Sequence, residues 1–431
     1  MSRPLSRRRL LATIGAAGTF SVAGCSGVLN TGPDSGNTAD RTESNGDGSS
    51  NGANPADPST QTSIPDGPVG DVIDDFENSV SDRWEAVAGS MRVDSNSPAK
   101  GSQALVLEGT EQVQLTQSFF SDDESDSGVD LSAHDLSMAV RFEEPTRGKI
   151  QIHARSIDGT EIVAKRYLPK ELDGWTQLDF GYTGESGSPS LDSITEIVVA
   201  VHTEGGQSIT VGIDELRKIP KADTGKVMFQ FDDSVADAYE KAFPELKKRG
   251  WSGGIAVMPE VTGKEGRLSL ENMQEMAEAG WDMMSHTSID KLPTRPEQEQ
   301  KSAIEESKAY LTSNGFEKGA RHFVAPNGRV DETTIEQISN NHLANYMFGG
   351  CPANAKRPSN MYTIPRVMGK SPDEVVDLVD LAAKHNQLVI IQYHHIGADA
   401  PTSMEGFKQV VNHVEKADVE VVSPSDFVDS I

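Results

Sequence analysis

Apolar and polar positions alternate in short runs along the middle of the chain. The clearest runs cover residues 103–108, 136–142, 149–154 and 197–202, and turn residues separate them. Alternation with a period of two is typical of strands that bury one face, and runs spaced in this way are typical of an antiparallel β-sandwich. We therefore expect a sandwich domain over residues 71–220.

The pattern changes at about residue 221, where apolar runs begin to alternate with amphipathic helices. Strand-like runs cover residues 227–231, 253–258, 281–284, 322–324, 343–347 and 388–393, and helical periodicity covers residues 236–248, 270–279, 297–312, 373–384 and 404–414. Repeated strand–helix units predict a parallel sheet, and roughly 210 residues are enough to close it into a barrel. We expect an α/β barrel over residues 221–431, with its site at the carboxyl ends of the strands.

The first 25 residues have the features of an export signal. Arg7 and Arg8 precede an apolar stretch, residues 10–20, which is shorter than the ~20 residues of a transmembrane helix. The paired arginines resemble a twin-arginine signal, and the Val-Ala-Gly-Cys that ends at Cys25 resembles a lipobox, in which the cysteine is lipidated. The alternative is an ordinary cleaved signal with an incidental cysteine.

Residues 26–70 are rich in Ser, Gly, Asn and Asp and contain almost no large apolar side chain. This composition predicts a disordered tether. The leader and the tether together resemble those of exported lipoproteins of haloarchaeal type. We expect the protein to be exported and held at the outer face of the cell membrane by lipid on Cys25.

The composition excludes several classes of partner and site. The 66 acidic residues outnumber the 39 basic ones, which gives a net charge of −27. Such a charge repels nucleic acid, and it also fits a surface that is hydrated at high salt. The two cysteines cannot make a disulfide framework or a cysteine-based zinc site, so Cys351 is expected to be a structural thiol. Nothing in the sequence indicates a protein partner.

The predicted sandwich carries two kinds of candidate binding residue. Residues 74–77 and 211–216 resemble the first and last strands of galactose-binding-like jelly rolls, many of which bind carbohydrate. Trp84 and Trp175 are either platforms for sugar rings or, as is more usual for aromatic residues, part of the core. Carboxylates such as Asp75 and Asp214 are candidates for a structural calcium site.

Polar residues follow several of the barrel strands. In chain order these are Asp232 and Asp233, then His286, then residues 324–328, then His394 and His395. Each feature alone is more often a cap, a turn or an ordinary polar residue. Two carboxylates held close together repel each other, and a bound cation removes this repulsion. Carboxylates together with imidazoles are ligands that suit zinc.

Four of these segments resemble the motifs of the polysaccharide deacetylases, also called carbohydrate esterase family four, whose catalytic unit is the NodB-homology domain. The segments occur in the family order: Phe229–Ser234, Gly280–Thr287, Phe323–Gly328 and Val389–Ile396. The resemblance covers about residues 222–431. It implies a distorted (β/α) barrel and a divalent metal, most simply zinc.

The resemblance also implies roles for individual residues. Asp232 matches the catalytic base, Asp233 and His286 match metal ligands, and Asp290 stands where the family has a third, histidine ligand. His394 matches the histidine that protonates the leaving group, with His395 as the alternative; Pro326 and Asn327 match the segment that lines the substrate pocket and holds the oxyanion.

The chain departs from the family pattern at three positions. Asp290 replaces a histidine, the arginine expected near Val324 is missing, and Asn327 replaces an aromatic residue. A carboxylate at Asp290 is a legitimate zinc ligand, and the alternative is that Asp290 only caps a turn. The departures concern metal ligation, orientation of the base and the shape of the sugar pocket.

The favoured interpretation is metal-dependent hydrolysis of N-acetyl or O-acetyl groups on a cell-surface or extracellular polysaccharide. The first alternative is a catalytically impaired, glycan-binding lipoprotein on the same scaffold. The second is a glycoside hydrolase, which would need a further acid at a strand end, and only Asp290 is a candidate.

Overall fold

The computed structural model describes residues 69–119, 128–145, 147–169, 171–172, 174–203 and 205–431. The predicted export signal, the lipidation site Cys25 and residues 26–68 of the predicted tether lie outside the described residues. Within the described ranges, no helix combines the length and the apolar character needed to span a membrane.

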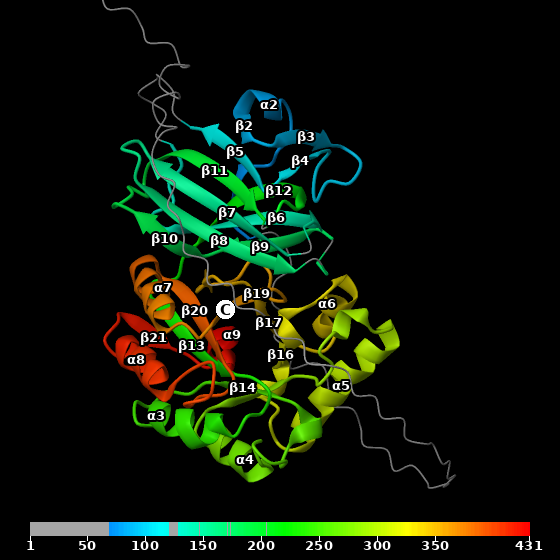
Figure 1. The fold of residues 1–431 in the computed structure, drawn as a ribbon, viewed down its shortest axis with the longest axis vertical. Coiled ribbons are helices and arrows are strands. Elements are labelled where there is room, and N and C mark those ends of the chain that lie inside the picture. Colours follow the sequence, from blue (N-terminus) through cyan, green and yellow to red (C-terminus); the bar gives the residue numbers. More distant parts are fainter. Residues whose placement is uncertain (1–68, 120–127, 146, 170, 173, 204) are drawn as a thin grey trace, which may run out of the picture. The chain divides into compact units, whose positions relative to one another are not determined.

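The first part of the described chain is an antiparallel sandwich (Figure 1). Its elements are β1 (Asp71–Asp74), α2 (Val80–Arg83), β2 (Trp84–Ala88), β3 (Ser90–Asp94), β4 (Ala104–Thr110), β5 (Gln112–Ser118), β6 (His134–Glu144), β7 (Arg147–Ser156), β8 (Glu161–Pro169), β9 (Thr176–Phe180), β10 (Tyr182–Ser186), β11 (Ile194–His202) and β12 (Ser208–Pro220). The strand order is β10-β8-β7-β11-β5-β4-β12-β6-β9, and the turn between β4 and β5 joins the two layers. The predicted antiparallel sandwich is confirmed.

Alternation of side chains explains why these strands form two layers. In β5, Val113 and Leu115 are fully buried between the layers, whereas Gln114 and Thr116 lie on the outer face. Trp84 belongs to the same core: it is 1% exposed, and its Nε1–H donates to Asp74 at 3.0 Å. The core interpretation of Trp84 is therefore confirmed.

The carboxylates proposed for calcium accept hydrogen bonds from backbone N–H groups instead. Asp214 Oδ2 accepts from Ala99 at 3.0 Å and from Lys100 at 3.1 Å, and its Oδ1 accepts from Glu215 at 2.8 Å. Asp75 Oδ1 accepts a hydrogen bond from the N–H of Glu77 at 3.0 Å. Among the residues that the structure describes, no three carboxylate, imidazole or thiol groups are placed to hold a cation.

The second part is an α/β barrel. Its elements are β13 (Gly225–Phe231), η2 (Ala238–Ala242), α3 (Phe243–Lys247), β14 (Gly254–Val257), η3 (Pro259–Val261), α4 (Leu270–Glu278), β15 (Asp282–Ser285), η4 (Leu292–Thr294), α5 (Glu297–Ser313), η5 (Gly319–Arg321), β16 (His322–Val324), η6 (Pro326–Gly328), α6 (Glu332–Ser339), β17 (Ala344–Phe348), β18 (Ala353–Asn354), β19 (Ile364–Met368), α7 (Pro372–His385), β20 (Gln387–Tyr393), α8 (Met404–Val414), β21 (Val419–Val421) and α9 (Pro424–Asp429).

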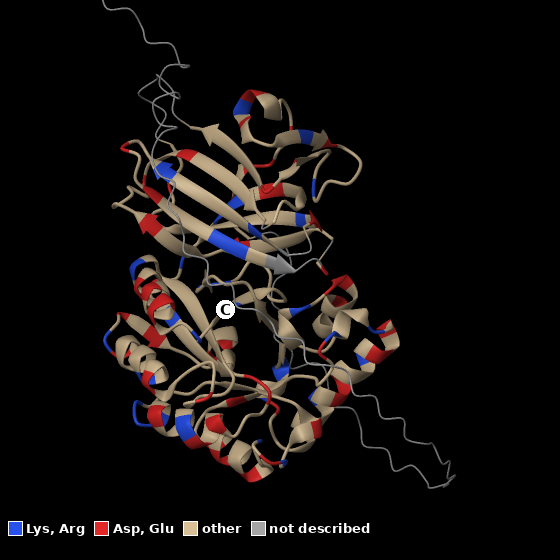
Figure 2. Cartoon of the chain, viewed as in Figure 1, with Lys and Arg blue, Asp and Glu red and all other residues tan. Residues whose placement is uncertain are grey.

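Strands β13, β14, β15, β16, β17, β19 and β20 pair in parallel in this order, and β20 pairs with β13 to close the ring. The described barrel thus has seven parallel strands instead of the eight of a regular (β/α) barrel, which confirms the distorted barrel. Along β13, Met228 faces the interior, whereas Val227 and Phe229 face the surrounding helices. Figure 2 shows that Asp and Glu are frequent on these helices.

Buried polar contacts join the sandwich to the barrel. The N–H of Tyr182 donates to Gln387 at 2.9 Å, and Asp135 accepts from Gln387 and from Asn354, both at 2.8 Å. Arg166, which is fully buried, donates to the carbonyl of Thr363. These contacts link residues that are 197 to 252 positions apart in the sequence. We call this region the junction.

Candidate active site

The end of β13 presents two consecutive carboxylates. Asp233 and Ser234 have φ angles of 63° and 51°, the left-handed region that residues other than glycine rarely adopt. This turn leaves Asp232 almost fully buried, with its N–H donating to the Tyr393 carbonyl at 2.9 Å. The side chain of Asp233 remains 35% exposed. Strained backbone of this kind is common at functional sites, and here it separates one buried carboxylate from one accessible one.

Asp232 is held by a buried guanidinium that sequence reasoning missed. Arg366 on β19 is 1% exposed, and it donates from Nη1 to Oδ1 at 2.7 Å and from Nη2 to Oδ2 at 3.0 Å. Gln392 on β20 donates to Oδ2 at 2.7 Å. Arg366 therefore fixes the orientation of the Asp232 carboxylate, although it stands on β19 and not near Val324, where the resemblance led us to expect an arginine.

These contacts decide the protonation state of Asp232. Burial alone would raise the pKa of its carboxyl, but Arg366, assisted by His286 and His394, lowers that pKa below the ordinary value. Asp232 is consequently ionised near neutral pH, and its orientation is set by two fixed donors.

His286 follows β15 and faces the second carboxylate. Its Nδ1–H donates to the Val324 carbonyl at 2.7 Å, and its other ring nitrogen, Nε2, lies 3.4 Å from Asp233 Oδ1. Burial would lower the pKa of His286, but Asp233, Asp232 and the Val324 carbonyl raise it above the ordinary value. Ser307 on α5 fixes the backbone, because its hydroxyl accepts from the His286 N–H at 3.1 Å.

The two histidines after β20 point in different directions. His394 Nε2 lies 3.9 Å from Asp232 Oδ2 and 3.8 Å from Asp233 Oδ2, and the side chain is 38% exposed. The other histidine contacts a different carboxylate: His395 Nδ1 lies 3.2 Å from Asp237 Oδ2. His394 is therefore the histidine that faces both carboxylates.

Asp290 does not join this cluster. Its side chain is exposed, and its main-chain carbonyl accepts from the Asn327 side chain at 3.1 Å. In the described ranges of the chain, no three His, Cys, Asp or Glu side chains form a group that could hold a metal. Of the predicted set Asp233–His286–Asp290, the structure brings Asp233 and His286 together and leaves Asp290 apart from them.

Two of the predicted ligands nevertheless fit a metal ion. The 3.4 Å between Asp233 Oδ1 and His286 Nε2 agrees with the roughly 3.3 Å that separates two ligands of a tetrahedral zinc with bonds of about 2.0–2.1 Å. A backbone carbonyl that receives the other ring N–H is the usual arrangement for a ligating histidine. The residues therefore fit an ion held by Asp233 and His286.

The turn expected to line the substrate pocket lies at the same end of the barrel. Pro326 is buried, and Asn327 has a φ of 54°, which places it in the left-handed region. A Cβ on the next residue, Gly328, would lie 2.6 Å from the backbone nitrogen of Phe348, so only glycine allows the turn to pack against β17.

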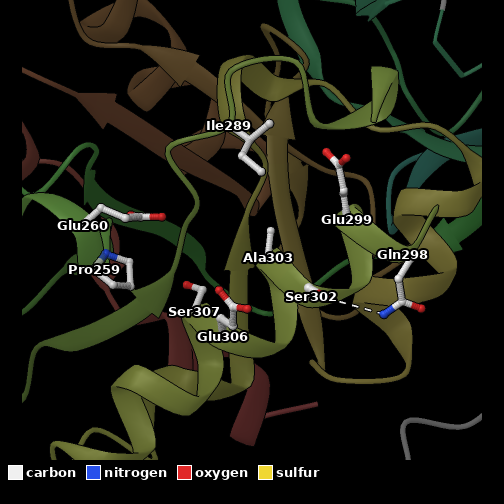
Figure 3. A pocket seen from close by; sticks show the side chains of 9 residues that line it. All are labelled: Pro259, Glu260, Ile289, Gln298, Glu299, Ser302, Ala303, Glu306 and Ser307. Atoms are coloured by element: carbon white, nitrogen blue, oxygen red, sulfur yellow. Dashed lines mark hydrogen bonds between the residues drawn. The ribbon is translucent and has the colours of Figure 1, made fainter. Parts of the chain in front are cut away.

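A cavity of about 380 Å³ lies beside the segment that follows His286 (Figure 3). Its lining includes Glu260 from η3, Ile289 from the segment after His286, and Glu299, Glu306 and Ser307 from α5. Ser307 connects this cavity to the His286 backbone. The three carboxylates would disfavour a negatively charged occupant.

Comparison with known proteins agrees with this geometry. Residues 220–346 match the family model for polysaccharide deacetylase. A curated protein of Bacillus subtilis (strain 168), named "Putative polysaccharide deacetylase YxkH", is 34% identical over 145 residues, or 33% of this chain and 50% of that protein. The chain thus spans about half the length of this curated relative. Part of the barrel is therefore similar to polysaccharide deacetylases.

Solved structures are similar to each part of the chain. The Xyl-CE4 domain of a xylanase from the hindgut metagenome of Trinervitermes trinervoides is 16% identical, with 48% of this chain and 91% of that chain covered and a TM-score of 0.36. The deacetylase PplD of Streptococcus pyogenes is 24% identical, with 35% and 69% covered and a TM-score of 0.30. A family 11 carbohydrate-binding module of Clostridium thermocellum is 16% identical, with 36% and 96% covered and a TM-score of 0.27.

Proposed function

We propose that this protein is a metal-dependent deacetylase that hydrolyses N-acetyl or O-acetyl groups of a polysaccharide. The observation that carries the proposal is the pair of unlike carboxylates at the end of β13. Asp232 is buried and held by Arg366, whereas the neighbouring Asp233 is accessible and faces His286. Two carboxylates in such different environments can divide the work of a base and a metal ligand. The predicted location at the outer face of the membrane remains part of the proposal.

Hydrolysis requires a proton acceptor, a proton donor and stabilisation of the developing oxyanion. Asp233 and His286 would hold a divalent metal, which when bound lowers the pKa of a water ligand and polarises the acyl oxygen. Asp232 would accept the proton of the attacking water, in the orientation that Arg366 sets.

His394 would supply the proton for the leaving group. Its Nε2 lies within 4 Å of both carboxylates, and its 38% exposed side chain can reach a bound substrate. Attack of water on the acyl carbon and cleavage of its bond to nitrogen or oxygen would yield acetate and an amine or alcohol. Backbone N–H groups of the η6 turn, around Asn327, are the candidates to stabilise the oxyanion.

Acetate release from acetylated chitooligosaccharides and from acetylxylan tests the proposal. We expect release in the presence of zinc, and we expect Asp232→Asn to lower the rate by at least about 100-fold, the usual loss for a general base. Asp380→Asn is a matched control, because Asp380 contacts His413 on the helix surface. Folded wild-type protein that releases no acetate from either substrate would contradict the proposal.

One observation favours a second function, which is glycan binding without turnover. Asp290 does not complete a three-residue metal site in the described part of the chain. Calorimetric titration with zinc distinguishes the two functions. We expect His286→Ala to weaken zinc binding at least about 100-fold and Asp290→Ala to change it by less than about threefold, because His286 faces Asp233 whereas the Asp290 side chain is exposed and lies outside this pair. Wild-type protein that binds no zinc but binds glycan would support the second function.

A further inference from the structure

Tyr167 extends from the sandwich to the mouth of the barrel. It lies near the end of β8, and its N–H donates to the Gly349 carbonyl at 2.9 Å. Its ring stacks on that of Phe348, with 5.8 Å between the ring centroids and 27° between the planes. A Cβ on Gly350 would lie 2.7 Å from the Tyr167 ring, so a glycine there gives the ring its space. Tyr167 remains 36% exposed.

Phe348 belongs to the rim of the candidate active site. It is the last residue of β17, and its neighbour in the parallel register is Arg366, the residue that holds Asp232. The η6 turn packs against its backbone on the other side. Met368, two residues beyond Arg366, is 41% exposed. The exposed Tyr167 thus stacks on the residue paired with Arg366, and the exposed Met368 follows Arg366 on the same strand.

We propose that Tyr167, Phe348 and Met368 form a binding subsite for the sugar ring next to the acetylated residue of the polysaccharide. This inference rests on the proposed function, which it extends from the acetyl group to the neighbouring sugar. The apolar C–H face of a pyranose ring packs against aromatic rings, whose faces are electron-rich. Lys165 Nζ lies over the Tyr167 ring, 5.2 Å from its centroid, so it covers part of the ring and adds a hydrogen-bond donor for sugar hydroxyls.

The other aromatic candidates of the sandwich are less suitable for this role. Trp84 is buried in the core. Trp175 is partly buried and donates to the Ser97 carbonyl, within the sandwich, at 2.8 Å. Tyr167 differs because it contacts a residue of the barrel rim. The sandwich would thus take part in substrate binding at the catalytic mouth itself.

Binding measured without turnover tests the subsite separately from the proposed function. In the Asp232→Asn background, we expect Tyr167→Ala to weaken calorimetric binding of N-acetylated tetra- and hexasaccharides by about tenfold, because one stacking contact is lost. Binding of the N-acetylated monosaccharide should change less than about twofold. Tyr167→Phe keeps the ring and should bind within about twofold of the parent protein. Trp175→Ala is the matched aromatic control and should also leave oligosaccharide binding unchanged.

The possible outcomes separate the two proposals. If Tyr167→Ala binds the oligosaccharides as tightly as its Asp232→Asn parent, the subsite proposal is overturned, whether or not the wild type releases acetate. A length-dependent loss would support the subsite even if no acetate were released. If Tyr167→Ala weakens binding of the monosaccharide as much as binding of the oligosaccharides, the subsite proposal is also overturned, because the lost contact would then not belong to a neighbouring sugar. Thermal unfolding of each variant verifies that the fold is intact.

Discussion

The mouth of the barrel and the junction both bury charged side chains, but they stabilise them differently. At the mouth, Asp232 and Arg366 are 3% and 1% exposed and form a two-pronged ion pair. At the junction, Asp135 and Arg166 are 2% and 0% exposed. Asp135 accepts hydrogen bonds from neutral amides, and Arg166 donates to a neutral carbonyl.

The pKa values show the consequence of this difference. Arg366 outweighs burial and lowers the pKa of Asp232, whereas burial raises the pKa of Asp135 to about 7, against the opposing effect of Lys221. A buried carboxylate thus stays ionised where a guanidinium pairs with it, and keeps its proton to a higher pH where its hydrogen-bond partners are neutral amides. The negative charge is therefore preserved on Asp232, where the proposed hydrolysis needs a base.

The largest expected effect comes from removing the guanidinium at the mouth. Arg366→Met leaves Asp232 buried and unmatched, so we expect the free energy of unfolding to fall by about 3–5 kcal/mol. Acetate release should fall at least about 100-fold, since the base loses its orientation. Urea unfolding and acetate assays measure both. Arg321→Met is the control, because its ion pair with Asp429 is at the surface and contributes about 1 kcal/mol or less. An Arg366→Met protein that is as active and as stable as the wild type would contradict the contrast between the mouth of the barrel and the junction.

Most of the architecture could be predicted from the sequence, because local periodicity sets it. The runs at 227–231, 322–324 and 388–393 coincide with β13, β16 and β20 within two residues, and the segment 404–414 is α8. Asp233 and His286 meet because both follow parallel strands, whose carboxyl ends lie at one end of a barrel. The same reasoning correctly brought His394 to the two carboxylates.

Two features of the site could not be predicted in this way. Strand β19 was missed because Pro365 and Arg366 interrupt its apolar pattern, although an arginine within such a run is itself a signal of a buried partner. Asp290 was matched to a ligand position from the family resemblance alone. The segment 286–290 has neither helical nor strand structure, and Asp290 is exposed, so no local periodicity fixes where its side chain lies.

The junction was also beyond sequence reasoning. Asp135 is more than 200 positions from both Asn354 and Gln387, and no periodicity in one segment indicates a partner in another. A barrel without the sandwich would expose Asn354 and Gln387 and lose their acceptor.

The second expected effect is a pH dependence that originates at Asp135. Its folded pKa of about 7 exceeds the unfolded value of about 3.9. The corresponding stability is fully present below pH ~4 and is lost as the pH rises through about 7, by up to about 1.4 kcal/mol per pH unit. Wild-type protein should therefore lose about 2–4 kcal/mol more between pH 4 and pH 8 than Asp135→Asn, as measured by urea unfolding.

Glu161→Gln is the control for this measurement. The His153 and Arg155 side chains lower the pKa of Glu161 to about 2, although burial opposes them. Its contribution to stability is therefore present above pH ~4.5 and is lost as the pH falls towards 2, the opposite direction. Equal pH profiles for wild type and Asp135→Asn would show that the junction carboxylate does not set the dependence.

The smallest effect is expected for the second buried arginine. Arg166→Met removes a donor from the Thr363 carbonyl, which costs about 1–3 kcal/mol, but it also removes a buried charge that has no two-pronged carboxylate partner. Since methionine fills similar space, the two effects offset each other, and we expect the free energy of unfolding to change by less than about 2 kcal/mol. Acetate release should stay within about threefold of wild type, because Arg166 does not contact Asp232. If release instead falls as far as in Arg366→Met, the junction must position the base through Gly349 and Gly350, whose N–H groups donate to the Arg366 carbonyl, and the division between mouth and junction would no longer hold.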